Sequence, residues 1–192
     1  MSFKSLALAS LLALPVSAFA DWQLDGGASA VNFVSVKKGT IAETHHFKGL
    51  SGAISDAGKA QLVIDLTSVE TNIPIRNERM QQMLFDTAKF AKASISTDVE
   101  VATLKALKPG QTMAIDADVT VDVHGQQKAE KAALQVTGLE GGKLLVTTSA
   151  PILLNAGNYE LLEGIEKLRE IAGLESISPI VPVSVKLVFA KQ

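Results

Sequence analysis

The chain has 192 residues, of which 47% are hydrophobic and 20% are charged, and its formal net charge is −2. It contains no cysteine, which excludes a disulfide framework and a lipid attached through a cysteine. The slightly acidic balance, without a long run of one charge, argues against a protein that binds the phosphate backbone of nucleic acids, because such binding needs a basic face.

The first twenty residues have the three parts of a secretory signal peptide. Lys4 supplies the positive start, residues 6–16 form an apolar core, and Ala18-Phe19-Ala20 is a small-x-small cleavage site. A buried N-terminal helix is the alternative, but it would not require these three parts together. We therefore predict a signal peptide at residues 1–20 and one domain at residues 21–192, a size that can bury a substantial core.

The next part of the chain has the pattern of antiparallel strands joined by short turns. Strands are expected at residues 31–38, 41–54 and 62–66, after a short apolar entry at residues 22–24. Turn signals are present at Gly39 and in the sequence Asp56-Ala57-Gly58-Lys59. Within the second strand, Gly49 and Gly52 would let the chain bend sharply, as closing a barrel demands.

Residues 76–95 interrupt the strands with a short helix. The first half of this stretch places apolar residues at helical spacing beside charged ones, so one face can be buried while the other stays in water. These residues are Met80, Met83 and Leu84 on the apolar side and Arg76, Glu78 and Arg79 on the charged side. Residues 86–91 are then a polar connection, and residues 93–101 resume the alternation of a strand.

Each of these helix residues has two interpretations. Met80 and Met83, like the neighbouring Leu84 and Phe85, would either line an adaptable pocket or simply fill the core. The arginines would either bind an anionic head group or form ion pairs that fix the helix in place. The sequence alone does not choose between the two.

The second half of the chain contains the clearest strand pattern. Residues 113–123 alternate between apolar and polar side chains, as in an antiparallel strand with one buried face. The sequence His124-Gly125-Gln126 breaks this strand, and residues 128–136 return as its hairpin partner. Further strands are expected at residues 144–150 and 181–189. Residues 159–172 carry the apolar stripe of a second helix, which Gly173 would end.

The residue pattern leaves the architecture open between a sandwich and a closed barrel. Seven or eight mostly alternating strands with two inserted helices suit either one. The difference matters for function, because an eight-stranded barrel can hold one small apolar ligand, whereas a sandwich usually fills its own interior.

Acidic and histidine side chains are the candidates for a metal or catalytic site. Asp116, Asp118 and Asp122 share one strand face, but carboxylates along a straight strand do not converge on one ion, so a solvated outer face is the better interpretation. His45 and His46 are adjacent and therefore point to opposite faces of a strand. The sequence has no phosphate-binding loop, zinc-protease pattern or serine elbow. We therefore expect no enzyme activity, no cofactor and no bound metal.

Four stretches and the closing strand occur in an order typical of one protein family. They are HFKGLSGAI (46–54), IDLTSVETN (64–72), RNERMQQMLFDTAKFAKASI (76–95), VTVDVHGQQK (119–128) and VPVSVKLVF (181–189). In this order they resemble the YceI-like family, exported lipocalin-like bacterial proteins associated with polyisoprenoid binding. The sequence departs from the family where Ala91 replaces a frequent proline, where Leu50 replaces an aromatic residue, and in the insertion at residues 158–178.

The resemblance implies a mainly β fold: a closed, antiparallel, lipocalin-like barrel of about eight strands with two short inserted helices. Its apolar interior would sequester a polyisoprenoid or a similar long-chain lipid, with the polar head near the opening, in the periplasm. Candidates for the apolar lining are Phe33, Phe47, Met80, Met83, Leu84, Phe85, Ile95, Val119, Val121, Val183 and Leu187, and candidates for the head group are Arg76 and Arg79. The lipid is the expected partner, with no nucleic acid and no transmembrane segment, and a homodimer is left open.

Two alternatives to a lipid carrier follow from the same sequence. The first is a non-enzymatic stress-response or interaction module whose barrel is filled by its own side chains, and the volume of the interior discriminates it from a carrier. The second is a hydrolase or isomerase that acts on a lipid, which a histidine and a carboxylate clustered at the barrel mouth would favour.

Overall fold

The structure is a computed structural model that describes residues 20–192. The predicted signal peptide, residues 1–20, lies outside the described residues except for Ala20. Residues 20–192 form twelve strands and three α-helices. The strands are β1 (Ala20–Leu24), β2 (Ala30–Lys37), β3 (Ile41–Phe47), β4 (Leu50–Ser55), β5 (Lys59–Asp65), β6 (Val69–Glu70), β7 (Lys92–Asp98), β8 (Thr112–Val123), β9 (Gln126–Gly138), β10 (Leu144–Thr148), β11 (Ile152–Asn155) and β12 (Ile180–Lys191). The helices are α1 (Pro74–Arg79), α2 (Val101–Ala106) and α3 (Leu162–Ile171).

Short helical turns connect several of these elements. A π-turn, η2 (Met80–Leu84), continues α1, and the 3₁₀ turns are η1 (Leu66–Ser68), η3 (Glu140–Gly142) and η4 (Ala156–Tyr159).

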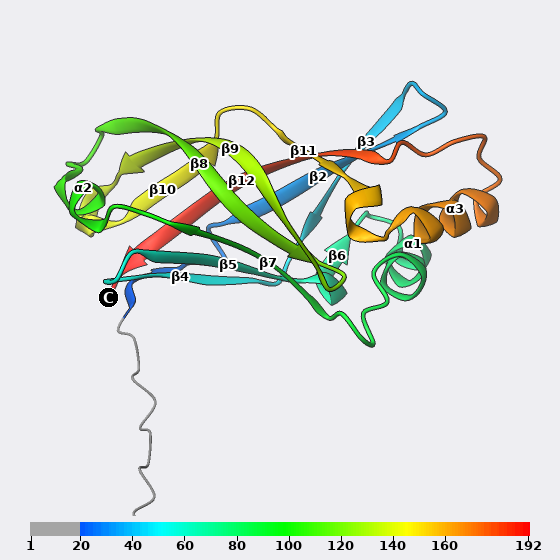
Figure 1. Cartoon of the computed structure of the whole chain (residues 1–192), viewed down its shortest axis with the longest axis horizontal. Coiled ribbons are helices and arrows are strands. Elements are labelled where there is room, and N and C mark those ends of the chain that lie inside the picture. The colour runs from blue at the N-terminus through cyan, green and yellow to red at the C-terminus, as the bar shows by residue number, and fades with distance from the viewer. Residues whose placement is uncertain (1–19) are drawn as a thin grey trace, which may run out of the picture.

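Eight antiparallel strands form a closed barrel (Figure 1). The hydrogen-bonded order runs β1, β4, β5, β7, β8, β9, β10 and β12, and β12 then pairs with β1 to close the ring. The prediction of a closed antiparallel barrel is therefore confirmed, and a sandwich of two separate sheets is excluded.

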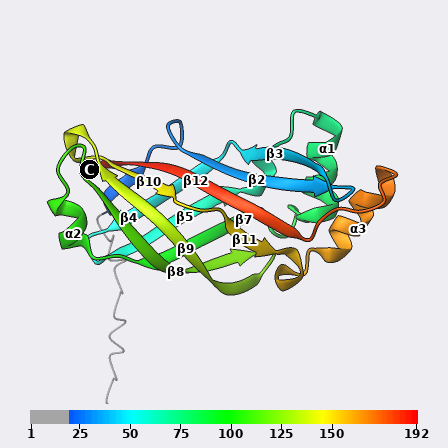
Figure 2. The ribbon, with the colours of Figure 1, turned by 90° about the horizontal axis from the view of Figure 1, so that it is seen from above.

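The barrel is elongated because further strands extend its wall beyond the ring. The second half of β12 pairs with β10 and β1, whereas its first half pairs with β11 and β2. Similarly, β4 pairs with β5, and β3, which precedes β4, pairs with β6. Figure 2 shows the resulting long axis, with α2 at one end and α1 and α3 at the other.

Close backbone approach explains two glycines in this architecture. A Cβ atom on Gly164 of α3 would lie 2.6 Å from the Met83 carbonyl oxygen and 2.7 Å from the Leu84 Cα atom. Only glycine therefore lets α3 pack directly on η2. Gly173 ends α3 as predicted, with a φ of +62° that glycine adopts without strain.

Three elements differ from the sequence-based expectation. The strand expected at residues 41–54 is divided into β3, which pairs with β2 and β6, and β4, which pairs with β1 and β5. The division lies at Lys48 and Gly49, because their amide groups donate to Ser68 of η1 and not to a neighbouring strand.

The strand expected to continue to residue 101 ends at Asp98, and Val101 begins α2, which the sequence pattern does not predict. Val101 and Leu104 are spaced three residues apart, so they share one face of a helix, and Leu104 is buried. The strand expected at residues 144–150 ends at Thr148. The next strand, β11, was not predicted, because among residues 20–192 it pairs only with β12, which comes later in the sequence.

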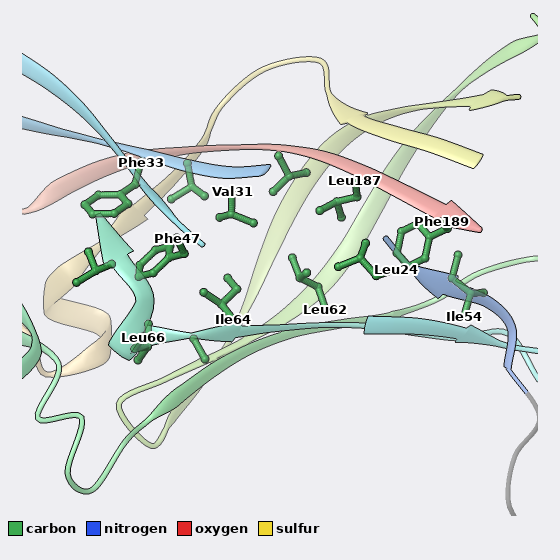
Figure 3. Close-up of a cluster of buried hydrophobic side chains, with 14 of the residues drawn as sticks. Leu24, Val31, Phe33, Phe47, Ile54, Leu62, Ile64, Leu66, Leu187 and Phe189 are labelled. Atoms are coloured by element: carbon green, nitrogen blue, oxygen red, sulfur yellow. The ribbon is translucent and has the colours of Figure 1, made fainter. Parts of the chain in front are cut away.

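The interior face of the barrel carries the apolar core. Figure 3 shows side chains from β2, β3, β5 and β12 pointing into the space between the walls, among them Phe33, Phe47, Leu62 and Leu187. On the opposite face of β8, Asp118 forms an ion pair with Lys131, and the Asp122 carboxylate accepts a hydrogen bond from Gln127. The prediction that this acidic face is solvated is confirmed.

A substitution at Gly52 tests the close contact of β4 with β5. A Cβ atom there would overlap the carbonyl oxygen of Gln61, so we expect Gly52→Ala to lower the free energy of unfolding by roughly 1–3 kcal/mol. Gly27→Ala is the matched control, because its Cβ would only reach ordinary contact distance. Urea unfolding of both variants checks the prediction, and equal midpoints for the two variants would contradict it.

Candidate functional site

The first of three chambers inside the molecule has a volume of about 400 Å³ and lies in the barrel near α2. Apolar side chains from β5, β7, β8, β9, β10 and β12 line most of it. Ala117 and Ala132 face each other across β8 and β9 in this lining. Their small side chains leave space where larger residues would meet.

The second chamber, of about 140 Å³, lies further along the barrel toward α1 and α3. Phe33, Phe47, Leu84 and Phe85 contribute to its lining, and Ile95 lines both this chamber and the first. The rings of Phe33 and Phe47 are 5.3 Å apart, which is within the range of a favourable aromatic pair.

The third chamber is a cleft of about 310 Å³ between β2, β3, α1 and α3. It shares Phe33, Leu84, Ile165 and Val181 with the second chamber. The three chambers therefore follow one another along the long axis of the molecule, from α2 to the cleft.

Charged side chains at this cleft form a small network. Arg76 of α1 donates to the Glu43 carboxylate at 2.6 Å and to the carbonyl oxygen of Thr71 at 2.6 Å. Lys37 also contacts Glu43, at 2.7 Å. Glu43 accepts hydrogen bonds from Lys37 and Arg76. Both bonds lower the pKa of Glu43 below its ordinary value of 4.5, and the bond from Lys37 has the larger effect. Within residues 20–192, Arg79 lines the cleft without an ion pair.

A buried histidine lies beside this network. His45 of β3 is only 3% exposed, its Nε2 atom lies 2.9 Å from the Ser35 hydroxyl oxygen, and its ring packs against Phe33. Burial lowers the pKa of His45 below 6.5, and the nearby positive charge of Arg76 lowers it further. Its Nδ1 atom has no hydrogen-bond partner within residues 20–192.

Every predicted site residue except Met83 lines one of the three chambers. The first chamber is lined by Val119, Leu187 and Ile95, and Ile95 also lines the second chamber. The second chamber is further lined by Phe47, Phe85, Val121 and Val183. The third chamber is lined by Met80, Arg76 and Arg79, and it shares Phe33 and Leu84 with the second. The side chain of Met83 is half-buried outside these linings, where α3 packs on η2. Binding of a ligand by these residues stays a prediction.

Sequence reasoning missed three kinds of lining residue. It did not identify the small residues Ala60 and Ala132, which create space, or Tyr159 from the insertion, whose hydroxyl donates to Glu130 at 3.0 Å. It also did not include His45 among the lining residues. The period of β3 could have placed His45 on the same face as Phe47, but the cleft that His45 lines is completed by α1 and α3, which come later in the sequence.

The arrangement of these groups does not assemble a nucleophile and a base with an orienting carboxylate. His45 contacts Ser35, whereas the Glu43 carboxylate accepts from Lys37 and Arg76. In the described part of the chain, no three His, Asp or Glu side chains gather closely enough to hold a metal ion. Among residues 20–192, no helix has both the length and the apolar character needed to cross a membrane.

Comparison with known proteins gives a family match over almost the whole described chain. The family model of the YceI-like domain matches residues 22–189. A polyisoprenoid-binding domain from Saccharophagus degradans, implicated in plant cell wall breakdown, has 42% sequence identity and a TM-score of 0.89, over 91% of this chain and 100% of that chain. No match was found among curated proteins.

Two more distant structures share the fold. Burkholderia cenocepacia BcnA has 19% identity and a TM-score of 0.62, over 86% of this chain and 98% of its own. A Campylobacter jejuni YCEI protein has 15% identity and a TM-score of 0.53, over 77% of this chain and 84% of its own.

The buried histidine gives a prediction on pH. Because burial lowers the pKa of His45 in the folded protein below its ordinary value of 6.5, the unfolded chain takes up a proton before the folded protein does as the pH falls. We therefore expect the fold to keep its full stability above pH 6.5 and to lose stability as the pH falls from 6.5 through the lowered pKa. The charged groups Arg76 and Lys37 act in the same direction, and Glu43 opposes them. A nuclear magnetic resonance titration of the histidine rings checks this prediction, and a pKa for His45 at or above 6.5 would contradict it.

Proposed function

The chain belongs to the YceI-like family, and on that premise we propose that it sequesters a polyisoprenoid or a similar amphiphilic lipid in its barrel. The observation that carries the proposal is the series of three chambers, lined mostly by apolar side chains, along the long axis. The ligand class comes from the Saccharophagus degradans domain, which is a polyisoprenoid-binding domain and is 42% identical to this chain.

The physical basis of such binding is the removal of apolar surface from water. Each buried CH₂ group contributes about 0.8 kcal/mol, so a long hydrocarbon chain binds strongly without any directional contact. The chambers also have suitable dimensions. A cavity of roughly 150 Å³ in another protein holds one benzene ring, and two of the three chambers here are about twice that size or larger.

The chambers bear directly on the two alternative functions. A barrel filled by its own side chains would not retain about 400 Å³ next to Ala117 and Ala132, so the interaction module is not supported. Membership of a binding family supports the expectation that the protein is not an enzyme. We therefore propose binding and carrying, with no chemical step.

We also propose that the protein acts in the periplasm. The proposal rests on the signal-peptide features of residues 1–20, namely the positive start, the apolar core and the Ala18-Phe19-Ala20 site. An exported carrier would shield an insoluble chain from water on its way between membrane surfaces.

The first experiment identifies the ligand. We expect organic-solvent extraction of the purified protein, followed by mass spectrometry, to release a long-chain isoprenoid lipid, because the chambers bury such a chain. Denatured protein from the same preparation, washed before extraction, is the control for lipid carried over by the purification. A protein that is empty after purification and also fails to take up added polyprenols would contradict the proposal.

A pair of neighbouring alanines tests where the lipid lies. Ala132→Phe places a ring in the first chamber, whereas Ala133→Phe places the same ring on the outer face, beside a surface hollow of about 290 Å³. We expect the first variant to carry less than half of the lipid of the unmodified protein and the second to carry the same amount. The lipid-to-protein ratio after extraction is the measurement, with circular dichroism to check folding. Equal lipid loads in the two variants would refute this location.

Export is tested with the full chain expressed in a Gram-negative host. We expect osmotic shock to release a protein whose intact mass begins at Asp21. A variant with leucine at positions 18 and 20 lacks the small residues of the cleavage site, so its precursor should accumulate uncleaved. Recovery of the unmodified chain in the cytoplasm with residues 1–20 attached would count against export.

A further inference from the structure

Exposed apolar side chains gather at one end of the molecule. Six large hydrophobic side chains are exposed on or beside α1, α3, the β2–β3 hairpin and the start of β12, elements that Figure 2 places opposite α2. With Leu153 of β11 as the seventh, the exposed large hydrophobics among residues 20–192 are Ile41, Ile73, Ile75, Leu153, Leu162, Ile171 and Ile180. Such a concentration of exposed apolar side chains usually marks an interaction surface.

Three of these side chains lie at the mouth of the third chamber. Ile73 and Ile75, at the start of α1, and Ile171, at the end of α3, line this cleft and are also 43%, 51% and 47% exposed. A residue that both lines a cavity and faces water marks the place where the cavity opens. The cleft therefore opens between α1 and α3, and the rim of this opening, formed by Ile73, Ile75 and Ile171, is apolar.

The charged side chains that line the cleft are all basic. They are Lys37, Arg76 and Arg79, and Arg79 has no acidic partner in the described part of the chain. Glu43, which pairs with the other two, and Glu78 of α1 are outside this lining. The three glutamates of α3 pair with basic residues of their own helix. The opening thus combines an apolar rim with a basic lining, a combination that binds the surface of an anionic membrane.

We propose that the α1–α3 end of the molecule docks on the surface of a membrane that contains anionic phospholipids, with Ile73, Ile75 and Ile171 inserted among the lipid head groups. This inference rests on the proposed lipid-binding function and adds the partner from which the ligand is taken.

Two observations favour a membrane over a protein as the occupant of the rim. The cleft shares Phe33 and Leu84 with the second chamber, so a lipid that leaves a bilayer at this opening enters the path into the barrel directly. A protein seated on the rim would instead close that path. The basic lining also complements the phosphate groups of anionic lipids, which attract lysine and arginine side chains to a membrane surface.

Sedimentation of the purified protein with lipid vesicles tests the docking. Vesicles of phosphatidylcholine are compared with vesicles of phosphatidylcholine and phosphatidylglycerol in equal parts, of which only the second kind is anionic. We expect the protein to bind the anionic vesicles about tenfold more tightly. Ile75→Glu places a negative charge in the rim and should weaken this binding by about tenfold, because an apolar contact is lost and a repulsion is gained.

Leu153→Glu is the matched control. Leu153 is 62% exposed, more than Ile75, but it does not line the cleft, so this variant should bind the anionic vesicles as the unmodified protein does. The Ile75→Glu variant should fold, since Ile75 is exposed in the first turn of α1, where a negative charge is favourable. Circular dichroism of both variants checks this.

A second measurement needs no substitution. It follows the transfer of the polyprenol solanesol from the two kinds of vesicle to the unmodified protein. Because docking precedes the extraction of a lipid, the initial rate should be several-fold faster from the anionic vesicles when both kinds carry the same amount of solanesol.

The outcomes separate this inference from the proposed function. Absence of vesicle binding by the unmodified protein would overturn membrane docking and leave a protein as the occupant of the rim. Equal binding of Ile75→Glu and Leu153→Glu to the anionic vesicles would also overturn docking through the rim. Equal binding of the unmodified protein to the two kinds of vesicle would overturn the requirement for anionic lipid. A protein that sediments with vesicles yet takes up no solanesol would overturn lipid sequestration alone.

Discussion

The closed ring of hydrogen bonds between neighbouring strands is the constraint on which the rest of the structure depends. Because β12 returns to pair with β1, each of the eight barrel strands has a hydrogen-bonded neighbour on both sides. The backbone therefore holds the wall together, and the side chains that point inward need not all meet one another. A sandwich has no such freedom, since its two sheets are held by the side chains that interdigitate between them. Closure is what allows ordinary alternating strands to enclose apolar chambers.

The size of the side chains that face each other then decides how much space the wall encloses. Ala117 lies opposite Ala132 in the first chamber, whereas Phe33 and Phe47 narrow the second. An unfilled apolar volume forfeits dispersion contacts, so these chambers reduce the stability of the empty protein. An apolar chain that filled them would restore such contacts, and it would also stabilise the folded state because it binds that state alone.

The sequence predicted those parts of the fold that depend on local periodicity. The alternating residues 113–123 lie in β8, the helix expected at residues 159–172 corresponds to α3, and the alternating residues 181–189 lie in β12. The sequence could not predict β11, because that strand is defined by its partner β12 and not by its own four residues. It also could not predict α2, because apolar residues two or three positions apart suit a strand end and a short helix equally well.

The candidate site shows the same division between local and long-range information. The amphipathic pattern of residues 76–84 correctly placed Arg76 beside an apolar face, but its partner Glu43 lies 33 residues earlier in the chain and is found only in the fold. For His45, adjacency to His46 argued against a metal site and gave no sign that its side chain lines a cleft. In the structure, His45 and Phe47 point inward from the same face of β3, two residues apart, one lining the cleft and the other the second chamber. The period of a single strand thus brings a polar group and an apolar lining into one continuous path, which is the arrangement an amphiphilic ligand requires.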